Sequence, residues 1–351
     1  MNKENKSNNL EKGLNVLSLC DGMSCGQIAL SKAGVKVNKF FASEIKDIAI
    51  KVTKYNYPNT IHVGDVNKIS YIDGILNTEV GSFKENIDII MFGSPCQTFS
   101  IACKTDKRIG LEDSKKSGLF LQCYRILKEI NPKYFFMENV ASMRECDKNY
   151  ISDLMGVKPY KIDAKILSPE LRNRYYWTNL NPKNKIPEKE IYLQDILSDG
   201  YTDRMKARSL LVSDSRPLTT PIKMFHRYYS TGFTTLIFKD RNHFEKCIKE
   251  YERIKGNKHK LSANELNYYA GTVFDGVRYL NQEELESCQC VPNGYTNCLN
   301  RNEAADVLGD GWNIDVISWF FSGLVYILHI VTKKYTKHNM QILELNKTHV
   351  L

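Results

Sequence analysis

The chain has 351 residues, of which 42% are hydrophobic and 25% are charged, a balance that excludes a disordered, collagen-like or multi-span membrane chain. Its 49 basic and 40 acidic side chains leave a net charge of +9, which permits a polyanionic partner without requiring one. Ten cysteines are scattered without a CxxC pair. This usage favours reduced thiols over a disulfide framework or a zinc ribbon, and we expect no metal site.

The first 180 residues alternate β-rich runs with helical patterns. The predicted strands are Leu14–Cys20, Val37–Glu44, Thr60–Val66, Ile87–Ser94, Tyr134–Val140, Tyr160–Leu167 and Arg174–Leu180. The predicted helices are Ser24–Ala33, Ile45–Tyr55, Ser117–Ile130 and Cys146–Met155. This alternation predicts an α/β fold with a doubly wound, mostly parallel, seven-stranded sheet. No helix separates the last two strands, which predicts an antiparallel pair at one sheet edge.

From residue 182 the pattern changes. Residues 182–189 are typical of a linker, and residues 201–270 are rich in Lys, Arg, Tyr, Phe and Thr with weak periodicity. A helical pattern returns at Asn281–Ser287, and the last strong helix follows Gly311. Within it, Val316–Val331 is a nearly continuous apolar run. It is shorter than the about 20 residues that span a bilayer, so we predict a buried helix, with a membrane anchor as the alternative. The polar opening MNKENKSNNLEKG predicts a frayed tail and shows no signal-peptide pattern.

Three features at predicted strand ends point to one ligand crevice. The turn Asp21-Gly22-Met23-Ser24 joins the first strand to a helix, where backbone N–H groups can approach a ligand closely. Its spacing is not GxGxxG, so a dinucleotide site is not supported. Glu44 ends the second strand, where a carboxylate can accept hydrogen bonds from ribose hydroxyls, and Asp65-Val66 ends the third. Each alone is also typical of an ordinary turn or helix cap. Together they favour a ligand that contains adenosine.

The fourth and fifth strands end in a thiol and a carboxyl group. Pro95 marks the abrupt end of the fourth strand, and Cys96 then stands at the sheet edge where open α/β sheets bind ligands. A small buried thiol is the ordinary interpretation of a cysteine, and we keep it for the other nine. The position of Cys96 favours a nucleophile. Glu138 follows the apolar YFFM, where a carboxylate is seldom buried unless it is paired or functional. Such a pair suits attack on an electron-poor ring whose nitrogen the carboxyl group protonates.

The order of DGMSCG, Glu44, GDV, GSPCQ, ENV and Arg172-Asn173-Arg174 resembles the cytosine-C5 DNA methyltransferases. The likeness covers residues 14–180 and resumes in YLNQEELESCQCVPNGYT and LGDGWNIDVI. In motif detail the sequence is similar to the animal de novo enzymes and their phage and bacterial relatives. Three positions depart from the family pattern: Glu170 stands for the usual Gln, Asp310 for an Asn, and Cys20 for an aromatic residue.

The resemblance implies a Rossmann-like S-adenosylmethionine methyltransferase fold and methyl transfer to C5 of a cytosine flipped out of DNA. Cys96 would add to C6, Glu138 would hydrogen-bond or protonate N3, and Arg172 and Arg174 would steady the base and the catalytic loop. The cofactor S-adenosyl-L-methionine would be held by Asp21, Gly22, Met23, Ser24, Glu44, Asp65, Val66, Pro95 and Trp312.

The resemblance also implies a division of the chain. Residues 1–181 would form the catalytic and cofactor-binding domain, residues 182–275 the target-recognition region and residues 276–331 the closing helices, with residues 332–351 unassigned. Residues 201–270 hold 14 basic and 7 acidic side chains, or +7 of the net +9. The stretch 97–117 is predicted to be a lid over DNA, with a solvated loop as the alternative. Contacts to phosphate or guanine are expected from Lys107, Arg108, Arg204, Arg227 and Arg241.

The expected partner is double-stranded DNA, bound by a monomer in the cytoplasm without membrane association. A cognate restriction endonuclease is a further partner if the enzyme belongs to a restriction–modification system, and the sequence does not distinguish that case from an orphan or phage enzyme. One alternative is a tRNA cytosine methyltransferase of the same fold. That branch carries Cys-Phe-Thr after ENV, whereas Ala141-Ser142-Met143 stands here. Another is a non-catalytic DNA-binding homologue, which would be expected to have lost Cys96 or Glu138.

Overall fold

A seven-stranded sheet organises the first half of the chain. The computed structural model describes residues 12–100, 109–113, 118–182, 184–210, 221–255 and 262–325. The strand order is β3-β2-β1-β7-β8-β11-β9, and only β11 runs antiparallel to its neighbours. This confirms the predicted doubly wound, mostly parallel sheet and its antiparallel pair, although β11 lies inside the sheet and β9 forms the edge. The strands are β1 (Leu14–Leu19), β2 (Val37–Ser43), β3 (Ile61–His62), β7 (Ile89–Phe92), β8 (Tyr134–Val140), β9 (Tyr160–Asp163) and β11 (Asn173–Thr178).

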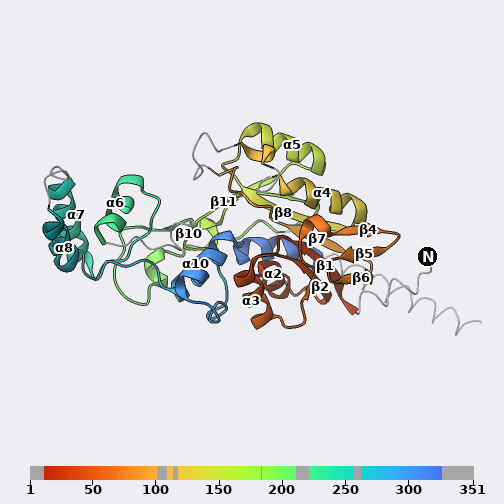
Figure 1. Cartoon of the computed structure of the whole chain (residues 1–351), viewed down its shortest axis with the longest axis horizontal. Coiled ribbons are helices and arrows are strands. Elements are labelled where there is room, and N and C mark those ends of the chain that lie inside the picture. Colours follow the sequence, from red (N-terminus) through yellow and green to blue (C-terminus); the bar gives the residue numbers. More distant parts are fainter. Residues whose placement is uncertain are drawn as a thin grey trace, which may run out of the picture.

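Successive side chains of the central strands enter two hydrophobic cores, one on each face of the sheet. In β7, Ile89 and Met91 belong to one core and Ile90 and Phe92 to the other. Because neighbouring residues of a strand point to opposite faces, such a strand must be apolar throughout. Helices α2 (Cys25–Lys32) and α3 (Asp47–Asn56) contribute to the first core, and α4 (Leu119–Ile130) and α5 (Glu145–Met155) to the second. Figure 1 shows helices on both sides of the sheet.

The chain returns to the first core near its end. Helices α9 (Gln282–Cys288) and α10 (Arg301–Asp310) and the helical residues 314–325 all contribute buried side chains to it. Val316, Phe320 and Leu324 are fully buried, so the apolar run forms the predicted core helix as far as residue 325, and residues 326–331 lie outside the described part. No helix among the described residues is long and apolar enough to cross a membrane.

Several elements were not predicted or differ in length. Strands β4 (Ser70–Ile72), β5 (Ile75–Thr78) and β6 (Gly81–Lys84) form a separate antiparallel sheet, and β10 (Glu170–Leu171) pairs with β12 (Ala207–Arg208). The turn between β4 and β5 is Asp73-Gly74 with positive φ at both residues, a hairpin signal that the sequence did contain. The third and sixth predicted strands are shorter than expected because Val66–Lys68 and Ala164–Ile166 form 3-10 turns capped by Asp65 and Asp163.

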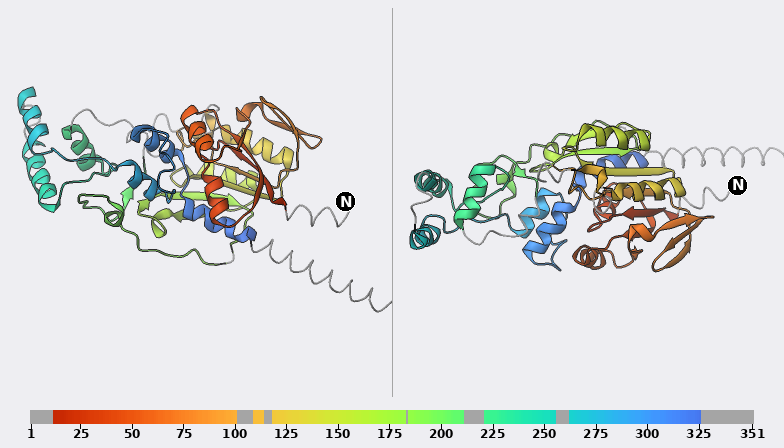
Figure 2. Two further views of the ribbon diagram at one scale, coloured as in Figure 1. Left: turned by 90° about the horizontal axis from the view of Figure 1, so that it is seen from below. Right: turned by 45° about the horizontal axis from the view of Figure 1, so that its top comes forward.

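Residues 201–270 show only weak periodicity in the sequence, yet they contain regular helices. Helices α6 (Pro221–Thr231), α7 (Arg241–Lys255) and α8 (Ala263–Thr272) lie there, and Figures 1 and 2 show them projecting from one end of the α/β body. We call residues 201–277 the projecting region. It has a core of its own that includes Phe225, Phe238 and Tyr251. The apolar stripe of α7 is narrow and is surrounded by charged residues, which obscures its helical period.

Candidate active site

A cavity of about 610 Å³ lies at the carboxyl ends of the central strands, between the first turn of the chain and the end of α10. Its size is that of a small-molecule site. Eleven residues predicted to act in catalysis or cofactor binding line it. They are Asp21, Gly22, Glu44, Asp65, Val66, Pro95, Cys96, Glu138, Arg172, Arg174 and Trp312. The structure therefore brings together residues that span almost the whole described chain.

Met23 and Ser24 do not line the cavity. Both are fully buried beneath the first turn. The Met23 carbonyl accepts a 2.7 Å hydrogen bond from the Tyr295 hydroxyl. Ser24 has a φ of 61° and donates its hydroxyl hydrogen bond to the Asp21 carboxylate. These two residues support the turn from the protein interior, so they would affect a ligand in the cavity only through the turn.

Asp21 lines the cavity, and its carboxyl group is mostly buried. Its Oδ2 accepts a hydrogen bond from the Ser24 hydroxyl, and its Oδ1 has no accessible surface. Burial raises the pKa of this carboxyl group to about 7, against smaller lowering effects of the Ser18 and Ser24 hydroxyls.

The Glu44 carboxylate is held rigidly at the end of β2. Oε2 accepts a 2.8 Å hydrogen bond from the Gly22 amide, and Oε1 accepts from the amides of Ile45 at 2.8 Å and Lys46 at 2.9 Å. At the end of β3, Asp65 Oδ1 accepts a 2.9 Å bond from the Asn67 amide. Both carboxylates retain acceptor capacity facing the cavity, which suits the hydroxyl and amino donors of a nucleoside.

A buried amide links the ends of β7 and β8. Asn139 Nδ2 donates to the Ser94 carbonyl at 3.1 Å and to the Ser94 hydroxyl at 3.2 Å. This link fixes the Pro95-Cys96 segment against the strand that carries Glu138. Sequence reasoning missed the role of Asn139, and its only signal was an amide beside Glu138 at the end of an apolar run.

Arg174 faces Glu138 inside the site. Its Nε lies 2.9 Å from Glu138 Oε1, and both side chains are largely buried. Burial raises the pKa of Glu138 above its ordinary value, and the positive charges of Arg174 and Arg172 only partly offset this. Burial likewise raises the pKa of Cys96, with Arg174 again acting in the opposite direction. Burial therefore shifts both groups toward their neutral forms.

Arg172 connects the sheet to the end of α10. Its Nη2 donates to the carbonyl oxygens of Gly309, at 3.2 Å, and Gly311. Its Nη1 lies 3.8 Å from Oε1 of Glu170, which is fully buried and has a pKa raised by burial. These hydrogen bonds join Arg172 to the closing segment of the chain. Its role in steadying the catalytic loop stays a prediction.

Trp312 closes the cavity from the C-terminal side. Its ring packs edge-on against Phe136 at 5.5 Å, and its backbone amide donates to Cys25 Sγ at 3.3 Å. A Cβ at Gly93 would lie 2.7 Å from the indole Nε1. Glycine at position 93 therefore allows the indole to approach the end of β7.

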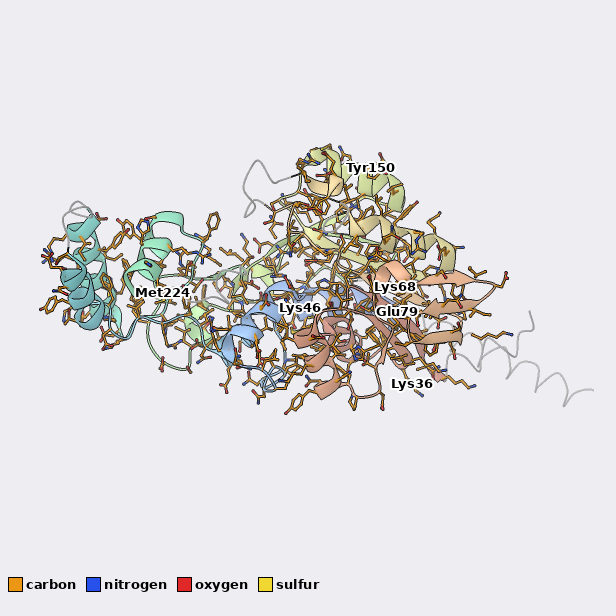
Figure 3. The ribbon with its side chains drawn as sticks, in the orientation of Figure 1. Lys36, Lys46, Lys68, Glu79, Tyr150 and Met224 are labelled. Atoms are coloured by element: carbon orange, nitrogen blue, oxygen red, sulfur yellow. The ribbon has the colours of Figure 1, made fainter. Side chains whose placement is uncertain are left out.

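Ile45 and Lys46 are among the residues that line the cavity but were absent from the predicted set. Ile45 is a hydrophobic side chain with 70% exposure at the cavity wall. Lys46 pairs with Asp306 at 3.0 Å and with Asp310 at 2.9 Å, so it bridges the start of α3 and the end of α10. Figure 3 labels Lys46 near the middle of the molecule.

Among the described residues predicted to contact DNA, Arg204, Arg227 and Arg241 do not line the cavity. Lys107 and Arg108, with most of the predicted lid, lie outside the described residues. The Arg204 guanidinium lies 4.7 Å from the ring centroid of Tyr228, Arg227 is half-buried on α6, and Arg241 pairs with Glu245 on α7. In the described ranges, no group of three or more His, Cys, Asp or Glu side chains is placed to hold a metal ion.

The family model for C-5 cytosine-specific DNA methylases matches residues 14–323. The chain belongs to this family. It is 36% identical over 170 residues to the type II methyltransferase M.NlaIV of Neisseria lactamica, a match that covers 47% of this chain and 36% of that protein. It is 31% identical over 202 residues to the orphan methyltransferase M.SPRI of Bacillus phage SPR, covering 53% of this chain and 43% of that protein. These matches span less than half the length of either relative.

Solved structures support the fold of a C-5 cytosine methylase. A DNMT2 mutant from Spodoptera frugiperda has a TM-score of 0.54 at 19% identity and covers 90% of this chain and 99% of its own. The Entamoeba histolytica methyltransferase EhMeth has a TM-score of 0.58 at 18% identity with the same coverage of 90% and 99%. At these identities the likeness concerns the fold alone.

Proposed function

We propose that this chain transfers a methyl group from S-adenosylmethionine to C5 of a cytosine in double-stranded DNA, with Cys96 as the nucleophile. One observation carries the proposal: Cys96 and Glu138, at the ends of adjacent strands, line the same cavity as Glu44 and Asp65. Membership of the cytosine methylase family and similarity to proteins named as DNA methyltransferases support the same reaction class.

The cavity wall suits S-adenosylmethionine. Glu44 would accept hydrogen bonds from the ribose hydroxyls, Asp65 and Val66 would hold the adenine, and Trp312 would lie beside the methionine portion. Asp21 lines the same cavity, and the segment from Gly22 to Ser24 shapes the turn that carries it. When bound, S-adenosylmethionine would supply an electrophilic methyl group to the base.

In the first step, the Cys96 thiol loses its proton to solvent and its sulfur forms a bond to C6 of the flipped-out cytosine. The electron pair of the C5–C6 double bond moves into the ring as Glu138 protonates or hydrogen-bonds N3, so that C5 becomes nucleophilic. The raised pKa of Glu138 favours the protonated form that can donate to N3. Arg174 holds this carboxyl group in place and stabilises negative charge on Cys96.

In the second step, C5 would form a bond to the methyl group as the bond between that group and the sulfur of S-adenosylmethionine breaks, and S-adenosylhomocysteine would leave. C5 then loses its hydrogen as a proton to solvent, the bond between Cys96 and C6 breaks, and the departing electron pair returns to sulfur, which regains a proton from solvent. Glu138 takes back the proton from N3, and the ring is aromatic again. The chain ends as it began, and the cytosine has exchanged one hydrogen for one methyl group.

We also propose that the projecting region recognises DNA. Residues 201–270 carry most of the net positive charge, which suits the phosphate backbone. Arg204, Arg227 and Arg241 would contact DNA there, and Lys107 and Arg108 would also contact DNA. A cognate restriction endonuclease would be a further partner if the enzyme belongs to a restriction–modification system.

The decisive experiment incubates the purified chain with S-adenosylmethionine and either plasmid DNA or tRNA, and quantifies 5-methylcytosine by mass spectrometry. Cys96→Ser is measured in parallel. We expect methylated DNA with the intact chain and none with Cys96→Ser. An intact chain that methylates neither nucleic acid contradicts the enzymatic proposal, methylation of tRNA alone contradicts the substrate, and an active Cys96→Ser variant contradicts the covalent mechanism.

A further inference from the structure

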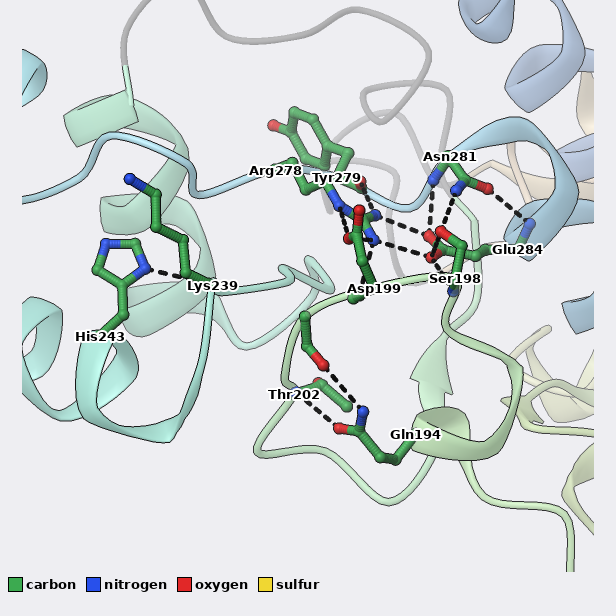
Figure 4. A network of polar contacts seen from close by, with 11 residues as sticks. Gln194, Ser198, Asp199, Thr202, Lys239, His243, Arg278, Tyr279, Asn281 and Glu284 are labelled. Carbon is green, nitrogen blue, oxygen red and sulfur yellow. Dashed lines mark hydrogen bonds and ion pairs between the residues drawn. The ribbon is translucent and has the colours of Figure 1, made fainter.

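Three segments of the chain lie side by side where the projecting region joins the α/β body. Tyr201 and Phe238 exchange two backbone hydrogen bonds of 2.8 Å, and Ile237 and Arg278 exchange two of 2.8 and 3.0 Å. We call residues 198–202, 237–239 and 278–281 the neck. Figure 4 shows their polar contacts from close by.

The Arg278 guanidinium occupies the centre of the neck. Nη2 donates to Asp199 Oδ1 at 2.6 Å and to Glu284 Oε1 at 2.9 Å, and Nη1 donates to Glu284 Oε2 at 2.8 Å. Asp199 lies where the chain leaves the body, and Glu284 is on α9 of the body itself. The planar guanidinium group of Arg278 therefore connects the segment that leaves the α/β body, the segment that returns to it, and the body itself.

Glu284 is the buried anchor of this network, with 1% exposure. Besides Arg278, its carboxylate accepts hydrogen bonds from the Ser198 amide and hydroxyl at 3.1 Å each and from the Asn281 amide at 2.8 Å. Burial alone would raise the pKa of Glu284, but these donors together lower it below its ordinary value. Charge-assisted bonds to a buried carboxylate are directional and strong, so they resist rotation as well as separation.

We propose that Arg278 is a positioning residue that sets the orientation of the projecting region relative to the cavity. The inference rests on the proposed function, because orientation matters only if DNA held by the projecting region must present its base to Cys96. Arg278 does not line the cavity, so its effect on methylation has to pass through this orientation. A two-sided guanidinium fork fixes an angle in a way that a single lysine ammonium cannot.

The test compares Arg278→Met and Arg278→Lys with Arg125→Met. Arg125 pairs with Glu129 within α4, so its loss removes the same charge without touching the neck, the cavity or the projecting region. We expect the KM for DNA of Arg278→Met to rise about tenfold and methylation to spread to sequences that the intact chain ignores, as read by bisulfite sequencing of a plasmid. Binding of S-adenosylhomocysteine, measured by calorimetry, should stay within about twofold. Arg278→Lys should be intermediate, and Arg125→Met should match the intact chain.

An Arg278→Met variant with unchanged KM and unchanged site preference overturns the proposal, as does one that loses cofactor binding and DNA methylation equally. If Arg278→Met does not fold, Asp199→Asn takes its place. This variant keeps the pairing of Arg278 with Glu284 and weakens only the contact with the segment that leaves the α/β body. If the intact chain methylates no DNA, the proposed function fails by itself. The neck is then tested by amide hydrogen exchange at Tyr201, Ile237 and Phe238, which should accelerate in Arg278→Met; unchanged exchange overturns the role of Arg278.

Discussion

The side-chain amide of Asn139 donates two hydrogen bonds to Ser94, one to the backbone carbonyl and one to the hydroxyl, at 3.1 and 3.2 Å. The contact joins the two strand ends that carry Glu138 and Cys96. Both residues are buried, so water does not compete for the amide donors. The relative placement of the proposed nucleophile and proton donor therefore depends on one amide.

Replacing Asn139 by Ala should lower both stability and activity. A buried polar partner left unsatisfied costs about 1–3 kcal/mol, and misplacement of reacting groups by about 1 Å can cost on the order of a hundredfold in rate. Urea unfolding and steady-state methylation measure the two effects. Asn179→Ala is the matched control, because Asn179 contacts Phe135 and Lys133 at the other end of β8. Equal loss of kcat in both variants would mean that the effect is one of general stability.

The local sequence pattern predicted where the strands lie and where they end. It could not predict contacts between residues that are far apart in the chain. Cys96 and Glu138 could be identified because each closes an apolar run, and the sheet edge then brings them together. Arg172 carries no local sign that its partners are the carbonyls of Gly309 and Gly311, which lie far along the chain. The Asp73-Gly74 hairpin and the stripe of α7 were present in the sequence but were short or flanked by charge. Asn139 and Lys46 became visible only once the neighbouring strand and α10 were in place.

Glu138→Gln should change the pH profile of kcat/KM as well as its size. The proposed chemistry needs a protonated Glu138 and a Cys96 thiolate, and burial raises the pKa of both groups. Between the two values the intact chain should be flat, because Glu138 loses its proton as Cys96 gains reactivity. Glutamine does not titrate, so the variant should rise with pH across this interval, from a rate about 10²- to 10⁴-fold lower. Profiles of the same shape for both proteins would argue against Glu138 as the proton donor.

Asp21→Asn should stabilise the chain at neutral pH and have little effect in acid. Burial raises the pKa of Asp21 from 3.8 to about 7, so between these values the folded chain holds a proton that the unfolded chain has lost. Stability therefore falls as pH rises through this window, by about 4 kcal/mol at most. Asparagine does not titrate, so the difference in unfolding free energy between Asp21→Asn and the intact chain should grow from pH 4 to pH 7. Urea unfolding midpoints of both proteins at four pH values measure this difference. Midpoints that change with pH in the same way for both proteins would contradict the prediction.

Lys46→Met should weaken cofactor binding without weakening the fold. Lys46 connects the segment after Glu44 to Asp306 and Asp310, and both Lys46 and Asp310 line the cavity. The pairs are partly exposed, so we expect the Kd for S-adenosylhomocysteine to rise only about three- to fivefold, with a smaller difference at high salt. Calorimetry at low and high ionic strength measures both effects.

Lys39→Met is the control for Lys46, since Lys39 pairs with Glu85 and does not line the cavity. The double variant Lys46→Asp with Asp310→Lys reverses the pair, so it should recover most of the lost affinity. Recovery would show that the attraction between α3 and α10 is what matters for the cofactor. If the double variant binds more weakly than Lys46→Met, the ammonium group of Lys46 contacts the ligand itself, and the bridge between the helices is incidental.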